Sequence, residues 1–223
     1  MNSNLSKRIG TSIILLIILS VSLLANKYLW LIVLMIASII SFHEFNNLIK
    51  KGFKNKKKLI QFLYIVNFLF LTLLVFVGYN IYTFPPTGII FIILICIFSD
   101  TGGYVIGRLI GGKKLTKISP NKTISGSFGS FVFSLLPLII YLTIYEVTGN
   151  VNFYSQNIIN LIYVSLFLSF VCQIGDLFIS YFKRKAKVKN TGSILPGHGG
   201  LLDRIDGLIF VLPVASIVDK ILF

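Results

Sequence analysis

Seven apolar segments, each close to the length of a membrane span, dominate this 223-residue chain. They cover residues 9–25, 29–46, 59–79, 87–106, 127–146, 158–180 and 205–222. A helix that crosses the hydrocarbon core needs about 20 mostly apolar residues, and it pairs its own backbone polar groups there. With 55% hydrophobic residues and a mean hydropathy of +0.87, the sequence predicts an all-α polytopic integral membrane protein with about seven transmembrane helices.

The basic residues separate by side of the membrane. If the N-terminus is cytoplasmic, all but two of the 21 Lys and Arg residues fall at cytoplasmic ends or loops, the exceptions being Lys27 and Lys220. This bias predicts an N-in, C-out orientation. The net charge of +14 then reflects topology and attraction to anionic lipid headgroups. No basic face with interleaved aromatic residues indicates nucleic-acid binding.

The remaining composition yields few alternatives to a membrane protein. Cys96 and Cys172 both lie inside apolar segments, which favours small core residues over a disulfide or a zinc site. The first apolar segment is longer than a signal-peptide core, and no small-residue cleavage site follows it, so we expect it to be retained. We expect two parts: residues 1–85, with three helices and a lysine-rich loop at 50–58, and residues 86–223, with about four helices and two polar cytoplasmic loops.

Four of the seven carboxylates cluster on the predicted cytoplasmic side. Asp100 and Asp176 lie within apolar segments, and Asp203 and Asp206 open the last one. An ionisable residue inside a membrane span is costly and indicates function. The i, i+3 spacing places Asp203 and Asp206 on one helix face. Carboxylates without a Cys/His cluster favour a hard cation such as Mg²⁺ over zinc.

Structural alternatives remain open for these carboxylates. Asp203 could be a helix N-cap, since a carboxylate there satisfies free N–H groups. Asp176 could form a simple salt bridge with Lys183 or Arg184, and Asp100 could be purely structural. Glu146 and Asp219 lie near predicted outside ends, where water can solvate them, and are assigned no role. Glu44 follows His43 at the inner end of the second segment.

Two glycine-rich loops fall on the same side as the carboxylates. One follows Asp100 and contains several glycines and lysines, and the other reads Pro196-Gly-His198-Gly-Gly200. Glycine lets backbone N–H groups approach an anion closely, and lysine supplies charge. The spacing does not match a P-loop. His198 is either a satisfied loop histidine or a group that contacts phosphate or relays a proton. Together these loops predict an ion and phosphate site at the cytoplasmic face of the membrane.

These motifs carry a family resemblance. From Ser180 onward, the run Ser-Tyr-Phe-Lys-Arg-x4-Lys-Asn … Leu-Pro-Gly-His-Gly-Gly-Leu-Leu-Asp-Arg-Ile-Asp resembles the signature of the phosphatidate cytidylyltransferases, or CDP-diacylglycerol synthases. The motifs at 99–104, 118–123 and 175–177 are similar to further family motifs. The resemblance covers residues 90–212 well, and the first 85 residues match only in general character.

The resemblance implies that CTP and phosphatidate react to CDP-diacylglycerol and pyrophosphate with Mg²⁺, and it leaves open a second, monovalent cation. The implied catalytic residues are Asp176, Asp203, Asp206, His198, Lys183 and Arg184. The implied substrate-binding residues are Asp100, Gly102, Gly103, Lys122, Gly199, Gly200 and Arg204. The implied metal ligands are Asp176, Asp203 and Asp206.

Some positions depart from the family pattern. Asn190 replaces an Asp, Ile179 replaces a Glu, and Ile124-Ser125 replace Trp-Glu, and each change removes a carboxylate or a large aromatic. The chain is short for the family, so fewer N-terminal helices are expected. The expected location is a bacterial inner membrane, and the oligomeric state stays open, with a homodimer as one option. Three alternatives remain: a CTP-dependent lipid-alcohol kinase, a transporter, and an inactive scaffold.

Overall fold

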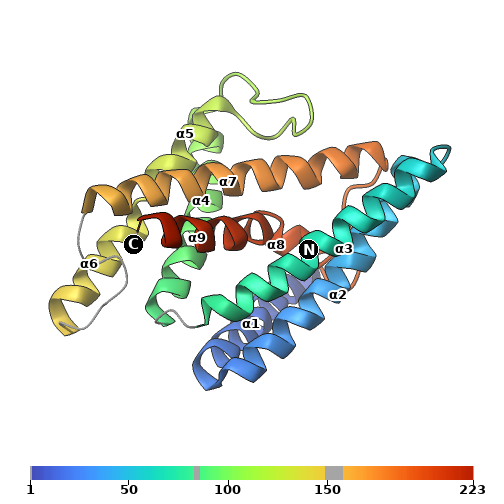
Figure 1. Ribbon diagram of the computed structural model, residues 1–223. Coiled ribbons are helices and arrows are strands. Elements are labelled where there is room, and N and C mark those ends of the chain that lie inside the picture. The colour runs from blue at the N-terminus through green and yellow to red at the C-terminus, as the bar shows by residue number, and fades with distance from the viewer. Residues whose placement is uncertain (1, 83–85, 149–157, 223) are drawn as a thin grey trace. The chain divides into compact units, whose positions relative to one another are not determined.

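The structure is a computed structural model that describes residues 2–82, 86–148 and 158–222, and within them the chain is helical apart from its connecting loops. The helices are α1 (Asn2–Ala25), α2 (Lys27–Gly52), α3 (Lys57–Ile81), α4 (Pro86–Ile110), α5 (Ile124–Phe133), α6 (Leu136–Thr148), α7 (Ile158–Lys185), α8 (Leu202–Ile205) and α9 (Leu208–Leu222) (Figure 1). The prediction of an all-α protein is confirmed for these residues.

All seven predicted apolar segments contain helix, but not all meet the length of a span. Among the described residues, five helices are long and apolar enough to cross a membrane: α2, α3, most of α4, the α5–α6 stretch Ile124–Thr143, and α7. The apolar parts of α1 and α9, Gly10–Ala25 and Leu208–Val218, are shorter. A membrane protein is therefore supported, and the count of seven and the N-in, C-out orientation stay predictions.

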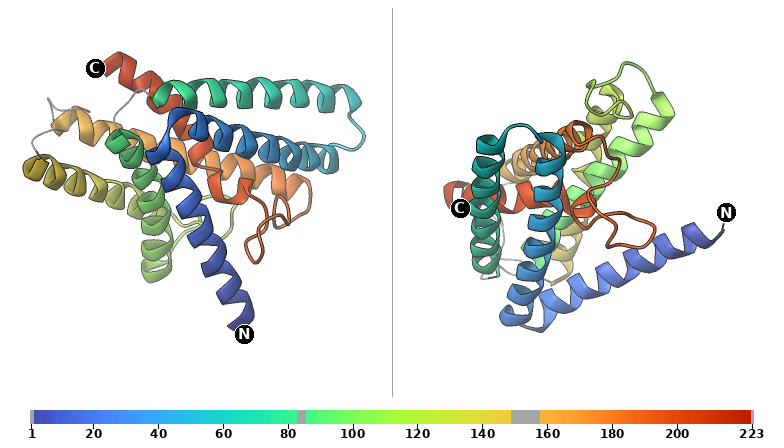
Figure 2. Two further views of the ribbon diagram at one scale, coloured as in Figure 1. Left: turned by 90° about the horizontal axis from the view of Figure 1, so that it is seen from below. Right: turned by 90° about the vertical axis from the view of Figure 1, so that its right-hand side faces the viewer.

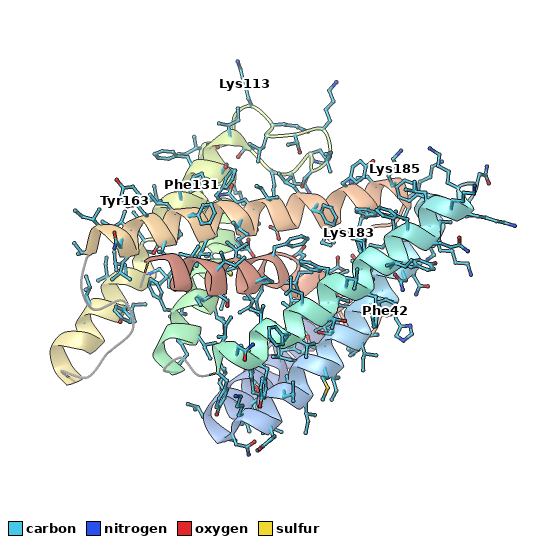
Figure 3. The ribbon with its side chains drawn as sticks, viewed as in Figure 1. Phe42, Lys113, Phe131, Tyr163, Lys183 and Lys185 are labelled. Carbon is cyan, nitrogen blue, oxygen red and sulfur yellow. The ribbon has the colours of Figure 1, made fainter. Side chains whose placement is uncertain are left out.

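The long helices expose large apolar side chains. Phe68 and Phe76 on α3 are 59% and 65% exposed, and Tyr163 on α7 is 66% exposed. Figure 3 shows Tyr163 pointing away from its helix. It also shows Lys113, in the loop after α4, and Lys185, at the end of α7, projecting from the chain. Exposing many large apolar side chains to water is unfavourable, whereas contact with lipid is compatible with them.

The chain divides into two compact units. The described residues of 2–82 and 181–206 form the first unit, and those of 83–180 and 207–223 form the second. The boundaries lie inside α7, after Ser180, and between α8 and α9, after Asp206. This division differs from the expected 1–85 and 86–223, because the segment after Ser180 packs with the N-terminal helices.

An antiparallel pair of helices, α2 and α3, is the frame of the first unit (Figure 2). The Trp30 indole N–H donates to the Gly78 carbonyl at 2.7 Å, in a buried bond between the two helices. The end of α7 packs on α2, where the rings of Phe182 and Phe45 lie 4.7 Å apart beside buried Leu48. These contacts fix the helix end from which Lys183 projects.

In the second unit, α4 packs against α5, α6 and α9. The predicted continuous helix at 127–146 is wrong in detail, because the chain breaks after Phe133 and resumes at Leu136. The Ser134 hydroxyl donates to the Phe131 carbonyl at 2.7 Å at this break. The last predicted helix is also divided: Asp203 lies in the one-turn α8, and α9 begins only at Leu208.

Candidate active site

The first candidate group of polar residues lies in the second unit, around Asp176 of α7. The Lys122 ammonium donates to Asp176 Oδ2 at 2.8 Å. Lys122 is presented by a hairpin-like loop between α4 and α5, in which the Lys122 N–H donates to the Ser119 carbonyl at 3.0 Å and the Leu115 N–H donates to the Lys122 carbonyl at 2.8 Å. The turn Ser119–Lys122 therefore places the lysine on the carboxylate.

Close packing of α4 on α5 holds this loop in place. A Cβ at Gly102 would overlap Phe133 and the Gly129 carbonyl, and one at Gly103 would lie 2.5 Å from Ser130 Oγ. Small residues let membrane helices approach closely. Gly102 and Gly103 thus have a packing role, and the substrate contact expected of them stays a prediction.

A cavity of about 310 Å³ lies between α4, α5, α7 and the loop, and Asp100, Lys122, Gln173 and Asp176 line it. The Asp100 carboxylate interacts electrostatically with Asp176 and Lys122. Two buried polar atoms in the lining, Asp176 Oδ1 and Gln173 Nε2, have no hydrogen-bond partner among the described residues. Ser127 Oγ donates to Gln173 Oε1 at 2.5 Å, so the amide is held with its second polar atom unpaired.

The lining fits a hard cation with phosphate. Within the described ranges, no three His, Cys, Asp or Glu side chains gather closely enough to hold a metal ion. Mg²⁺, however, commonly uses one or two carboxylates together with substrate phosphates and waters. A buried carboxylate oxygen without a donor is costly unless something binds it, and Asp176 Oδ1 is such an atom. Asp176 and its neighbour Asp100 therefore suit Mg²⁺ that arrives with a phosphate ligand.

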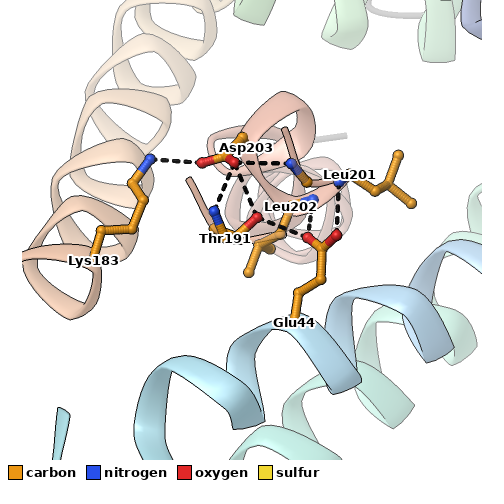
Figure 4. A network of polar contacts seen from close by, with 7 residues as sticks. Glu44, Lys183, Thr191, Leu201, Leu202 and Asp203 are labelled. Carbon is orange, nitrogen blue, oxygen red and sulfur yellow. Dashed lines mark hydrogen bonds and ion pairs between the residues drawn. The ribbon is translucent and has the colours of Figure 1, made fainter. Parts of the chain in front are cut away.

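The second group lies in the first unit, around Asp203 of α8 (Figure 4). Asp203 Oδ1 accepts from the Lys183 ammonium at 2.8 Å, and the two side chains are 9% and 16% exposed. Asp203 Oδ2 accepts from the Thr191 N–H at 2.8 Å and the Gly200 N–H at 3.1 Å, and the Thr191 hydroxyl oxygen lies 3.1 Å from it. Oδ2 thus accepts hydrogen bonds from the loop, and Oδ1 forms an ion pair with Lys183.

The N-cap alternative for Asp203 is wrong. The N-cap of α8 is Leu201, and its side chain makes no cap bond. Asp203 lies inside the turn instead and binds backbone N–H groups of the preceding loop. The alternative of a salt bridge between Asp176 and Lys183 is not formed, because Asp176 pairs with Lys122 and Lys183 pairs with Asp203.

The loop between α7 and α8 turns sharply at the predicted glycines. The Leu195 N–H donates to the Gly199 carbonyl at 2.8 Å, and the His198 N–H donates to the Leu195 carbonyl at 3.0 Å. Gly197 and Gly199 have φ of +78° and +98°, which L side chains rarely adopt. The His198 ring Nδ1 lies 2.5 Å from the Thr11 hydroxyl. His198 is thereby held in the first unit.

Comparison with known proteins places these residues in a family. The model of the cytidylyltransferase family matches residues 48–222. The phosphatidate cytidylyltransferase of Staphylococcus haemolyticus is 44% identical over 131 residues, which are 58% of this chain and 48% of the relative. Those of Staphylococcus epidermidis strain RP62A and Staphylococcus aureus strain COL are 46% identical over 132 residues, with the same shares.

The chain belongs to the cytidylyltransferase family. The resemblance seen in the motifs is confirmed. The chain spans about half the length of the curated relatives that it matches. The two ion pairs, Lys122–Asp176 and Lys183–Asp203, lie inside the matched residues.

The other residues that the family resemblance implies differ in how exposed they are. Arg184 and Arg204 are exposed, and Asp206 is half-buried at the end of α8. A Cβ on Gly199 would lie 2.9 Å from Asn190, and one on Gly200 would overlap Thr191 and Glu44. Each glycine therefore has a packing reason, and the phosphate contacts expected of them stay predictions.

Sequence reasoning missed three polar residues. Glu44, Thr191 and Gln173 are 4%, 7% and 8% exposed, and each is part of one of the two groups. Glu44 had a usable signal, because a carboxylate in an apolar segment is costly unless it is paired. Thr191 and Gln173 carry no charge, and nothing in their spacing separates them from ordinary polar residues.

Proposed function

We propose that this protein transfers CMP from CTP to phosphatidate, giving CDP-diacylglycerol and pyrophosphate. The relatives are named phosphatidate cytidylyltransferases, and the family match includes both Asp176 and Asp203 with their lysine partners. The observation that carries the proposal is the buried, unpartnered Asp176 Oδ1 beside Lys122 in a polar cavity. A nucleoside triphosphate requires a site that binds both its anionic phosphates and the cation that accompanies them.

The proposed reaction joins two anions. An oxygen of the phosphatidate phosphate attacks the α-phosphorus of CTP, a new P–O bond forms, and the bond to the pyrophosphate oxygen breaks. The attacking phosphate is already ionised, so no strong general base is needed. Catalysis then consists of positioning the two phosphates and neutralising their charge. Bound Mg²⁺ would screen the phosphates and stabilise the charge that passes to pyrophosphate.

The chain's own groups have distinct proposed roles. Asp176 would offer Oδ1 to Mg²⁺, and Lys122 would turn from Asp176 Oδ2 to a phosphate oxygen as substrate arrives. Asp203 would offer only Oδ1, since Oδ2 already accepts hydrogen bonds from two backbone N–H groups, those of Thr191 and Gly200. Lys183 would then pass from Asp203 Oδ1 to phosphate. In both groups, a lysine would neutralise the carboxylate before substrate binds, and would then move to a substrate phosphate.

The remaining assignments follow the family resemblance. Asp206 is proposed as a further metal ligand, and Arg184, His198 and Arg204 as phosphate-binding groups. Phosphatidate would enter from the bilayer that the exposed apolar helix surfaces imply. A bacterial cytoplasmic membrane fits relatives from Staphylococcus, and the predicted orientation would place the reaction at the cytoplasmic face.

The test uses purified protein in detergent micelles that contain phosphatidate, with α-³²P-labelled CTP and Mg²⁺. We expect label in the lipid extract with wild type, and about 10³-fold less with Asp203→Asn or with EDTA, because several kcal/mol of charge stabilisation are lost. Ser41→Ala is the matched control, since Ser41 is 1% exposed and its hydroxyl has no partner among the described residues.

Three outcomes would contradict the proposal. Label that is absent from the lipid with folded wild type excludes the transferase and favours a scaffold or transporter. Release of CDP together with a phosphorylated lipid alcohol, when one is supplied, indicates a kinase. Equal labelling by wild type and Asp203→Asn removes Asp203 from the site.

A further inference from the structure

Glu44 is a buried carboxylate that the proposed reaction does not use. It lies on α2 and is 4% exposed. Its Oε1 accepts from the Leu201 N–H at 3.1 Å, and its Oε2 accepts from the Leu202 N–H at 2.9 Å and the Thr191 hydroxyl at 2.8 Å (Figure 4). All three donors belong to the segment 191–202, which carries the family signature. Glu44 therefore binds this loop from outside it.

Such a carboxylate is not what packing alone would select. Burying an ionised group in an apolar helix is costly unless hydrogen bonds compensate it, and a leucine would fill the space at lower cost. The three groups that donate to Glu44 are two N–H groups and one hydroxyl of the loop. The hydrogen bonds that compensate the desolvation of Glu44 therefore also fix the position of residues 191–202.

Thr191 links Glu44 to Asp203. The Thr191 hydroxyl lies 2.8 Å from Glu44 Oε2 and 3.1 Å from Asp203 Oδ2, and the Thr191 N–H donates to the same Asp203 oxygen at 2.8 Å. The Gly200 N–H completes that oxygen's set at 3.1 Å. Residues 191 and 200–202 are thus held between two carboxylates. This arrangement turns Asp203 Oδ1 toward Lys183.

The glycines of the loop give an independent indication. A Cβ on Gly192 would lie 2.5 Å from Glu44 Oε1, and one on Gly200 would overlap Glu44 Oε2 and Thr191 Oγ1. Neither glycine has a positive φ, unlike Gly197 and Gly199. Space beside the carboxylate, and not backbone conformation, therefore requires glycine at these two positions. The loop is shaped to fit Glu44.

We propose that Glu44 is a positioning residue that sets the metal affinity of Asp203 through Thr191 and the backbone of Gly200–Leu202. This inference rests on the proposed function for its catalytic meaning, because it assumes that Asp203 Oδ1 binds Mg²⁺. Groups that orient a metal ligand typically contribute 10- to 100-fold to metal affinity or activity. Glu44 itself touches neither substrate nor metal.

The experiment compares wild type, Glu44→Gln and the matched control Ser41→Ala, which lies one turn away on α2 and has no partner to lose among the described residues. Gln keeps the size of Glu but replaces one acceptor with a donor that faces the N–H groups. Hydrogen–deuterium exchange reports the loop directly. We expect faster exchange at Leu201 and Leu202 in Glu44→Gln, with α3 unchanged, and no change in Ser41→Ala.

Metal affinity is measured without product formation, from the rise of the thermal midpoint with Mg²⁺ concentration, because a ligand of the folded state stabilises it by mass action. We expect the half-saturating Mg²⁺ concentration to rise about 10- to 100-fold in Glu44→Gln. Thr191→Val is a second variant in case Glu44→Gln fails to fold. It should shift Mg²⁺ affinity in the same direction, and Thr191→Ser should restore it.

Each result decides the inference. Unchanged exchange at Leu201 and Leu202, or an unchanged Mg²⁺ half-saturation in both Glu44→Gln and Thr191→Val, overturns it. Faster exchange throughout α2 and α3 with unchanged Mg²⁺ affinity assigns Glu44 to stability alone. A wild type whose midpoint responds to Mg²⁺ but which makes no CDP-lipid would end the proposed function and leave the positioning role of Glu44 intact.

Discussion

The two carboxylate groups differ in how completely they are paired. Around Asp203 and Glu44, each of the four carboxylate oxygens accepts at least one hydrogen bond. Around Asp176, one carboxylate oxygen and the Gln173 amide nitrogen are buried without a partner among the described residues, beside a cavity of about 310 Å³.

This difference indicates two kinds of preparation for a ligand. A saturated network keeps a loop rigid before substrate arrives, so no reorganisation is needed during the reaction. Unpaired buried polar atoms cost stability until something binds them. We call the Asp203 group the support, because its hydrogen bonds hold the loop in place. We call the Asp176 group the receptor, because its unpaired atoms can bind a ligand.

The largest expected effect separates the two aspartates. Both Asp203→Asn and Asp176→Asn should lower CDP-lipid formation by about 10³-fold. Only Asp203→Asn should lower the free energy of unfolding strongly, by about 2–4 kcal/mol, because Lys183 and the loop lose a buried acceptor. Lys122 is 31% exposed and can turn to water, so Asp176→Asn should cost about 1 kcal/mol or less.

Thermal midpoints in detergent, measured beside initial rates, check this prediction. An equal loss of stability in both variants would break the comparison between support and receptor. A larger loss in Asp176→Asn would reverse it.

A second variant tests the space beside Glu44. Gly200→Ala should lower the free energy of unfolding by about 1–3 kcal/mol, the usual cost of overpacking, since its Cβ would overlap Thr191 and Glu44. Gly10→Ala is the matched control, because nothing lies within 4 Å of a Cβ there. Urea or thermal unfolding in detergent measures both. Equal midpoints for the two variants would mean that the loop is not tightly held.

The smallest effect concerns the receptor group. Gln173→Leu should leave stability nearly unchanged, because the bond lost to Ser127 is offset by removal of an unpaired buried amide. If Gln173 Nε2 donates to substrate, kcat/KM for CTP should fall about tenfold, which is the value of one hydrogen bond. Ser127→Ala keeps the amide and serves as control. A drop in stability with unchanged kcat/KM would make Gln173 part of the support.

The apolar runs predicted the helices because the backbone N–H and C=O groups of each run must pair with one another in lipid. The structure places helix in every run. The break at Ser134–Leu135 could not be predicted, since apolar residues continue through it and hydropathy carries no signal there. The two-part division at residue 85 missed that residues 181–206 pack with the first helices. That packing depends on side-chain contacts such as Phe182 on Phe45.

The site was predicted as a list of residues and not as pairs. The motifs named Asp176, Asp203, Lys122 and Lys183, and all four form ion pairs. The alternative partners that the sequence offered for Asp176 were its neighbours Lys183 and Arg184, whereas the lysine that pairs with it, Lys122, is 54 residues away. Glu44 and Thr191 are 147 residues apart. Contacts over such separations are set by tertiary packing, which spacing along one helix does not reveal.

The anchor of the signature loop has a consequence for how this sequence can vary. Two of the three donors to Glu44 are main-chain N–H groups, those of Leu201 and Leu202. Nineteen of the twenty amino acids supply that group, and only proline lacks it. Leu201, which is only half-buried, can therefore be replaced widely without loosening the loop, while Leu201→Pro removes a donor outright. The loop is held by a part of the chain that most mutations do not alter.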